Sequence, residues 1–139
     1  MEGTGRYEIL PHTADIGVAS QGATLAEIIA NTAYAMFDLM FDLAEIEPQA
    51  SIEVVVTAQT PPELLVDCLS DLLAVAETRD LVLGRFHVEI EGTTAKIAAR
   101  GATTSTVAVT GPPIKAVTYH DLQCAWTGTE WRSRVIFDV

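Results

Sequence analysis

The chain has 139 residues, 49% of them hydrophobic, and its 19 acidic and 8 basic residues give a formal net charge of −11. This length suits one domain, so we expect a single domain over 1–139. Charged or polar residues interrupt the apolar runs before the roughly 20 residues that a membrane span requires. The few basic residues argue against direct high-affinity nucleic-acid binding, so a basic protein or a cation is the better candidate partner.

The first residues, MEGTGRYEIL, lack the basic region and the apolar run of a signal peptide, which favours a cytoplasmic protein. The two cysteines, Cys68 and Cys124, do not form a CxxC pair. Because Cys68 falls in the apolar stripe of a predicted helix, we expect buried free thiols rather than a disulfide.

In chain order, the pattern begins with two short strands, at 6–10 and 16–20, followed by a helix at 24–43. Apolar residues recur along this helix at helical spacing. Thr24 and Glu27 form a capping box at its start. We therefore expect an amphipathic helix that packs by one face.

A strand at 51–58 precedes the second amphipathic helix, which is predicted at about 61–78. Thr60 is its N-cap residue, Pro61 its first residue and Glu63 the acid of a second capping box. This helix too is expected to pack by one apolar face.

The remaining chain has the period of two that is typical of strands. A hairpin is predicted at 85–100, and the neutral stretch 102–110, before a proline corner, favours an edge strand. Strands follow at 114–120, 122–126 and 130–139. Together the elements predict an α+β domain with a largely antiparallel sheet and two main amphipathic helices.

The familiar motifs of phosphate-binding loops, dinucleotide sites, serine hydrolases and zinc proteases are missing, so candidate residues are scattered. His12 and Asp15 occur in PHTAD, a short connection between two predicted strands, where a loop can direct both side chains at one point. The alternative is a simple turn in which Asp15 accepts hydrogen bonds from backbone amides.

Further candidates lie on the second helix and on the strand IKAVTYH. Glu63, Asp67 and Asp71 recur at every fourth residue, which indicates either a solvated face or a site for a cation or a basic partner. Lys115, one of two lysines, is either a snorkelling strand-end residue or a phosphate ligand. His120 either caps a turn or belongs to a site.

Asp138 stands near the end of the strand EWRSRVIFDV. Alternation places it on the same face as Arg134, so an ion pair between the two is one interpretation. The other is that Asp138, the terminal carboxylate of Val139 and nearby backbone carbonyls gather hard oxygen ligands for a divalent cation. On this second interpretation the end of the chain forms part of the cation site.

The segments HTADIGV, NTAYAMFDLMFDL, PELLVDCLSDLL, IKAVTYHDL and WRSRVIFDV, taken together, resemble the archease family over residues 7–139. The resemblance implies the archease fold and an accessory role for the RtcB-type tRNA-splicing RNA ligase. In that role the protein is not itself an enzyme: it promotes guanylylation of the ligase by GTP, and hence its multiple turnover in tRNA splicing and RNA repair.

The same resemblance implies site residues. Asp15, Asp138 and Val139 match the metal site of the family, and Lys115 matches a lysine important for activation. His12 and His120 are additional candidates. The ion is expected to be divalent: calcium is the first expectation for a structure because it tolerates an irregular oxygen set, and manganese and magnesium are alternatives.

Two other functions remain open from the same residues. One is a stand-alone metal-dependent enzyme with an ion held by His12, Asp15 and Asp138, although no obvious nucleophile or general base accompanies them. The other is a chaperone-like modulator of another tRNA-processing enzyme, such as a tRNA methyltransferase.

Overall fold

The computed structural model describes residues 7–10 and 15–139. Within these residues the chain forms two α-helices, one short 3-10 helix and seven strands. In order they are β1 (Tyr7–Leu10), β2 (Asp15–Gly22), α1 (Leu25–Asp38), β3 (Ala50–Thr57), α2 (Pro61–Arg79), β4 (Leu81–Glu91), β5 (Thr94–Thr103), η1 (Thr104–Thr106), β6 (Ala116–Trp126) and β7 (Trp131–Asp138). In this described part of the chain, no helix combines the length and apolarity that a membrane crossing needs.

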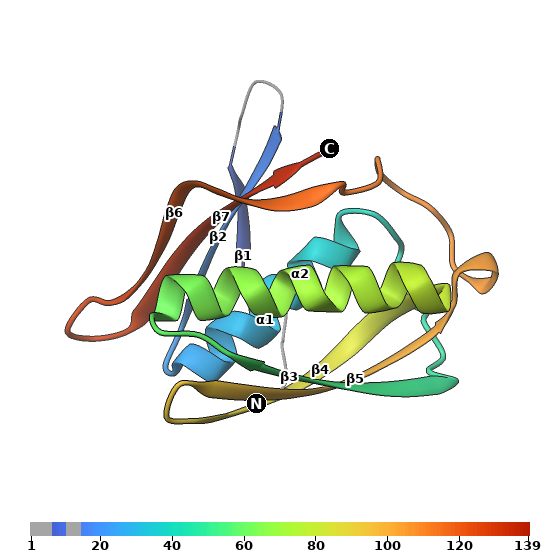
Figure 1. The fold of residues 1–139 in the computed structure, drawn as a ribbon. Coiled ribbons are helices and arrows are strands. Elements are labelled where there is room, and N and C mark those ends of the chain that lie inside the picture. The colour runs from blue at the N-terminus through green and yellow to red at the C-terminus, as the bar shows by residue number, and fades with distance from the viewer. Residues whose placement is uncertain (1–6, 11–14) are drawn as a thin grey trace.

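The strands form two antiparallel sheets with the helices between them (Figure 1). The four-stranded sheet has the order β1-β2-β7-β6, and the three-stranded sheet has the order β3-β5-β4. Helix α1 contacts β2 and β4, and α2 contacts β6 and β3, so each helix touches both sheets. The predicted α+β class and antiparallel pairing are confirmed, with two sheets in place of the one expected.

Both predicted N-caps are present. The Thr24 hydroxyl accepts a hydrogen bond from the Glu27 amide at 3.1 Å, and the Thr60 hydroxyl accepts one from the Glu63 amide at 3.3 Å. These bonds satisfy amides that have no partner inside the helix. The capping signals in the sequence therefore located both helix starts.

The end of α1 differs from the prediction, because the helix stops at Asp38 rather than at residue 43. The segment that follows pairs with the chain after β5: the amide of Asp42 bonds the Ala108 carbonyl, and the amide of Thr110 bonds the Met40 carbonyl, each at 2.9 Å. These tertiary bonds use backbone groups that a further helical turn would need.

The environment of α1 also corrects an expectation. Its residues from Ile28 to Phe37 are buried except Tyr34, so α1 does not pack by a single face. The cause is the presence of a sheet on each side. The buried Thr32 hydroxyl is satisfied, since it donates to the Ile28 carbonyl at 2.8 Å and lies 3.0 Å from the Ser20 hydroxyl.

The region from 102 to 126 contains two further differences. The stretch 102–110 is not an edge strand: β5 continues to Thr103, η1 follows, and Val109 makes a single bridge to Phe41. The two strands predicted at 114–120 and 122–126 are one strand, β6, interrupted by a bulge between Thr118 and Gln123. In the bulge Asp121 has a φ of 51°, a left-handed conformation that aspartate tolerates better than most residues.

One cluster of buried apolar side chains connects both helices with both sheets. Cys68 and Cys124 belong to it, and both are buried and free, which confirms the expected reduced thiols. In β7, Val135 and Phe137 belong to the core, so the even-numbered residues of this strand face away from the helices. This alternation determines where Asp138 lies.

Candidate functional site

The ends of three neighbouring strands meet where β2 begins, β7 ends and β6 begins (Figure 1). Asp15 and Asp138 are directly opposite each other in the β2–β7 pairing, and Ala116 is opposite Asp138 in the β6–β7 pairing. The three residues therefore form one row across the sheet. Asp15 is the first residue of β2 rather than part of the preceding connection.

Residues directly opposite in an antiparallel pair place their side chains on the same face, about 4.5–5.5 Å apart at Cβ. Because the next row, Ile16 and Phe137, belongs to the core-facing side, Asp15 and Asp138 lie on the outer face of the sheet. Asp138 is exposed and Asp15 is half-buried. Two carboxylates in this position repel each other, and a cation between them would reverse that cost.

Lys115 lies immediately before β6 and is held beside the same row. Its backbone amide donates a hydrogen bond of 2.7 Å to the Asp138 carbonyl, which fixes the start of β6 against the end of β7. The side chain of Lys115 is exposed. The fold therefore brings Asp15, Asp138 and Lys115 to the same end of the sheet, whereas a metal-binding or activating role for them stays a prediction.

Val139 follows Asp138 and is half-buried, with its side chain packed against the core. This packing holds the main chain of Val139 beside the two aspartates. Within the described residues no ion pair joins Asp138 to Arg134, so the alternative explanation of Asp138 has no support. His12 lies outside the described residues.

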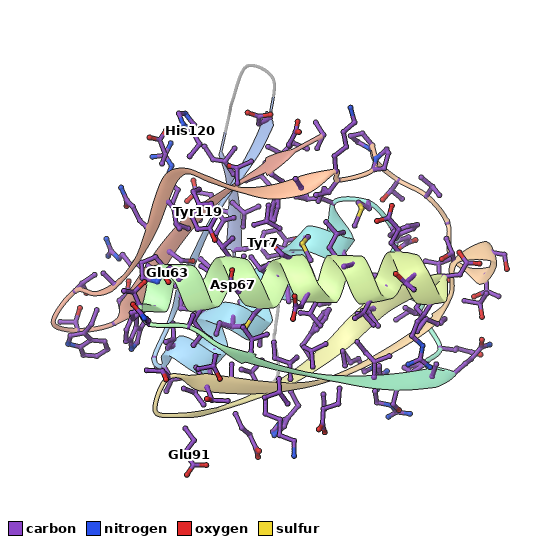
Figure 2. The ribbon with its side chains drawn as sticks, in the orientation of Figure 1. Tyr7, Glu63, Asp67, Glu91, Tyr119 and His120 are labelled. Atoms are coloured by element: carbon purple, nitrogen blue, oxygen red, sulfur yellow. The ribbon has the colours of Figure 1, made fainter. Side chains whose placement is uncertain are left out.

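His120 does not belong to this row. It lies in the bulge of β6, where its Nε2 is 3.5 Å from the Asp121 carboxylate, and Figure 2 shows it pointing away from α2. A strand-end prediction could not reveal the bulge, because the sequence contains no glycine there to indicate it.

The same bulge brings Tyr119 next to the acidic row of α2, which consists of Glu63, Asp67 and Asp71. The Tyr119 hydroxyl donates to the Asp67 carboxylate at 3.4 Å, and Figure 2 shows Tyr119 directed at the end of α2 that carries Glu63 and Asp67. The negative charge of Asp67 raises the pKa of Tyr119 above its ordinary value, with a smaller contribution from Glu63. The acidic row is evident in the sequence, but the contact with Tyr119 is not, because only the bulge brings Tyr119 to the row.

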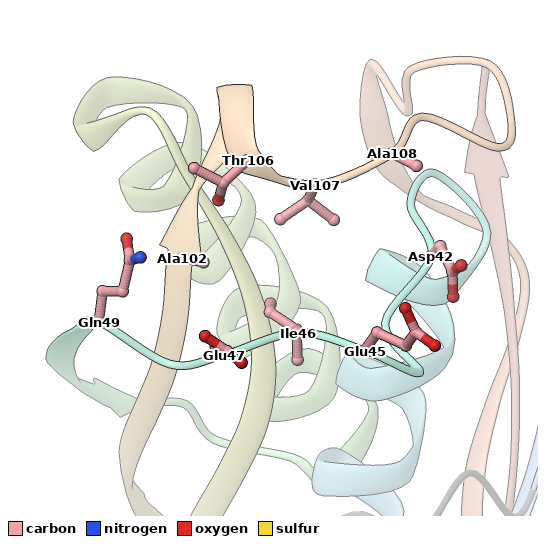
Figure 3. A pocket seen from close by; sticks show the side chains of 9 residues that line it. All are labelled: Asp42, Glu45, Ile46, Glu47, Gln49, Ala102, Thr106, Val107 and Ala108. Carbon is pink, nitrogen blue, oxygen red and sulfur yellow. The ribbon is translucent and has the colours of Figure 1, made fainter.

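A pocket of about 300 Å³ lies between the segment after α1 and the segment after β5 (Figure 3). Ile46 and Val107 face into it, and Asp42, Glu45 and Glu47 supply carboxylates around it. The Asp42 carboxylate accepts a bond from the Ala44 amide at 3.1 Å, which serves the local turn. The sequence did not indicate this pocket, because it forms between segments that are distant along the chain.

Three or more His, Cys, Asp or Glu side chains do not come together in a metal-binding arrangement anywhere in 7–10 and 15–139. Asp15 and Asp138 are therefore a pair of carboxylates, and an ion between them would complete its coordination with main-chain oxygens, including that of Val139, and with water. A hard divalent cation accepts such a set. The residues present thus fit a partly hydrated ion better than a fully enclosed one.

Comparisons with known proteins agree on one family. The model of the Archease protein family (MTH1598/TM1083) matches residues 7–139. Protein archease of Methanosarcina acetivorans is 35% identical over 140 residues, covering 96% of each chain, and that of Thermococcus gammatolerans is 34% identical over 123 residues, covering 85% of this chain and 87% of its own.

Two solved structures share the fold. The solution structure of Methanobacterium thermoautotrophicum protein 1598 superimposes with a TM-score of 0.86 at 28% identity, covering 98% of this chain and 100% of its own. The crystal structure of an archease from Thermotoga maritima, described as a possible chaperone, gives a TM-score of 0.67 at 20% identity and covers 94% of each chain. The latter likeness concerns the fold alone.

Proposed function

The chain belongs to the archease family, and we propose that it is an accessory protein of an RtcB-type tRNA-splicing RNA ligase. In this role it is an activator rather than a catalyst. It promotes guanylylation of the ligase by GTP, so that each ligase molecule joins RNA ends repeatedly in tRNA splicing and RNA repair. We place this activity in the cytoplasm.

The observation that carries the proposal is the row formed by Asp15 and Asp138, with Lys115 fixed beside it by a 2.7 Å backbone bond. These are the residues on which the sequence resembles the family's metal site and activating lysine. They come from three separate segments, and the register of two strand pairs brings them to one edge of the molecule. That edge is accessible, since Asp138 and Lys115 are exposed.

In this proposal the Asp15 and Asp138 carboxylates hold a divalent cation, with a main-chain oxygen of Val139 as a further ligand. When bound, such an ion neutralises phosphate charge near a nucleotide. The carboxylates bind and orient it at the accessible edge. Lys115 carries a positive charge that repels a cation, so we assign it to a phosphate or to a carboxylate of the ligase.

The charge of the chain supports a protein partner. A formal net charge of −11 favours encounter with a basic RNA-handling enzyme, because complementary potentials speed association and orient the two surfaces. The same charge disfavours RNA as the primary partner. We therefore propose contact with the ligase itself, with the exposed Asp138 and Lys115 near the contact.

The test is a ligation assay in which RNA with a 2′,3′-cyclic phosphate is in large excess over the ligase. We expect product far beyond one turnover per ligase only when this protein is added, and accumulation of guanylylated ligase in a parallel reaction with labelled GTP. Absence of stimulation with an active cognate ligase would refute the proposal. Turnover of either substrate by this protein alone would instead support the stand-alone enzyme.

A further inference from the structure

Two arginines lie side by side on the outer face of the three-stranded sheet. Arg85 of β4 and Arg100 of β5 are direct partners in the antiparallel register, and both are exposed. Their neighbours in the strands, Phe86 and Ala99, are buried in the core, so alternation places both arginine side chains on the face that points away from the helices.

A β-bulge creates this alignment. Leu83 pairs with Gly101 and Arg85 pairs with Arg100, so Gly84 is an extra residue in β4. Leu83 is fully buried, and simple alternation would turn Arg85 inward as well. The extra residue shifts the phase and turns Arg85 outward, which is a recognised effect of bulges.

Glycine is required at position 101 and favoured at position 84, one on each strand of the bulge. A Cβ on Gly101 would lie 2.0 Å from the Val82 carbonyl oxygen, and a Cβ on Gly84 would lie 3.0 Å from the Ile46 side chain. Both positions therefore favour a residue without a side chain. The alignment of the two arginines follows from a specific backbone feature, and it does not depend on side-chain rotamers.

The pair has no counterion within the part of the chain that the structure describes. Neither Arg85 nor Arg100 forms an ion pair or a side-chain hydrogen bond there. Lys96, which lies on the same face, does have a counterion: its Nζ is 3.8 Å from Oε1 of Glu53. Ser51, the residue opposite Arg100 on β3, is neutral.

Like charges directly opposite each other destabilise a sheet. The chain has 19 acidic residues that could have relieved this repulsion. Among the residues that the structure describes, however, none of them forms an ion pair with Arg85 or Arg100. An anion from outside the chain would remove the cost. The chemistry of the guanidinium group then indicates which anion.

We propose that Arg85 and Arg100 form a binding site for a phosphate group. Neighbouring strands are about 4.8 Å apart, so two long side chains from opposite positions can reach one small anion. Each guanidinium presents a planar fork of donors that matches phosphate oxygens, and the two positive charges match the charge of a phosphate. Two cations are too few to hold an extended RNA strand on a strongly acidic chain.

This site is separate from the row of Asp15 and Asp138. The two lie on different sheets, with both helices between the sheets (Figure 1). The proposal does not depend on the ligase, and its test does not use the ligase. Failure of one proposal leaves the other standing.

The test is an NMR titration of the ¹⁵N-labelled protein with inorganic phosphate, against sodium chloride at equal ionic strength. We expect saturable shifts of the Nε–H signals of Arg85 and Arg100 in phosphate. Arg85→Gln and Arg100→Gln should each weaken binding about tenfold, the equivalent of one charge-assisted contact. Lys96→Gln, which removes the same charge from the same face, should leave the affinity unchanged.

Shifts that fail to saturate, or that respond equally to chloride, would overturn the site. Equal weakening by Lys96→Gln would overturn it too, because that result describes general screening. Circular dichroism of each variant checks the fold, which removal of a like-charge pair should not harm. Guanosine monophosphate and a short single-stranded RNA, used as alternative probes, then distinguish the source of the phosphate group by their relative affinities.

Discussion

The backbone amide of Lys115 donates a 2.7 Å hydrogen bond to the carbonyl oxygen of Asp138. This bond continues the pairing of β6 with β7 beyond Ala116, the first residue of β6. Because it joins main-chain atoms, it survives substitution of either side chain. The charges of the two residues can therefore be removed without removing the contact that aligns the strands.

Asp15→Asn and Asp138→Asn test whether the two opposed carboxylates hold the proposed cation, because both changes remove a charge and keep the size of the side chain. Each should lower stimulation of the ligase at least roughly tenfold, the range observed when residues around bound metals are changed. The unfolding temperature of Asp138→Asn without metal should hold or rise, since this change removes the repulsion between Asp138 and the opposed Asp15 carboxylate. The readouts are the multiple-turnover assay and thermal unfolding.

Asp71→Asn is the matched control, because it removes an exposed carboxylate from α2. It should retain stimulation. Calcium at about 100 times its dissociation constant should stabilise the parent by about 2.7 kcal/mol, and a chelator should reverse this. Equal stabilisation of the parent and of Asp138→Asn would remove Asp138 from the ligands.

Lys115→Ala should weaken activation of the ligase while leaving the calcium affinity unchanged or slightly higher. The reason is that a protonated amine near a cation site opposes the cation and suits a phosphate or a carboxylate of the partner. The turnover assay measures activation of the ligase, and calorimetry measures the calcium affinity. Lys96→Ala, on the other sheet, controls for loss of positive charge; loss of calcium binding in Lys115→Ala alone would mean that Lys115 organises the ion site.

Tyr7 links β1 to α1, since its hydroxyl donates to the Asp38 carboxylate. Burial, followed by this bond and the charge of Asp38, raises the pKa of Tyr7 above its ordinary value of 10.0. The folded state therefore keeps the phenolic proton longer than the unfolded state. The resulting stability is fully present below pH 10 and is lost as the pH rises further toward the folded pKa.

Tyr7→Phe should therefore lower the free energy of unfolding at pH 8 by about 1 kcal/mol, the usual net value of a hydrogen bond. It should also flatten the decline in stability above pH 10. Urea unfolding between pH 7 and 11 measures both effects. The control is Tyr119→Phe, whose hydroxyl bonds Asp67 at the surface; an equal loss in both variants would show that the Tyr7 bond has no special role.

The two thiols should be unreactive in the folded protein. Burial raises the pKa of Cys68 and of Cys124 to about 12, so the thiolate that attacks a disulfide reagent is scarce at pH 8. We expect no labelling of the native parent within minutes, and two labels per chain in denaturant. Ser105→Cys adds an exposed thiol and should label at once; rapid labelling of native Cys68 or Cys124 would contradict the buried positions.

The sequence by itself located the helix starts, most strands and the two faces of β7. These features depend on neighbouring residues: Thr24 and Thr60 cap helices through bonds within one turn, and alternation along a strand follows from backbone geometry. The candidate residues Asp15, Asp138 and Lys115 were also identified in advance, through the resemblance of their motifs to a known family.

Only the tertiary structure decided which of these residues meet. The register of β7 between β2 and β6 sets Asp15 opposite Asp138, and a bulge of one residue sets Arg85 opposite Arg100. Neither pairing can be predicted from the alternation of apolar and polar residues along one strand, because register depends on the partner strand. The burial of α1 between two sheets and the early end of that helix have the same origin: packing and hydrogen bonds from distant segments outweigh the weak local preference for one more helical turn.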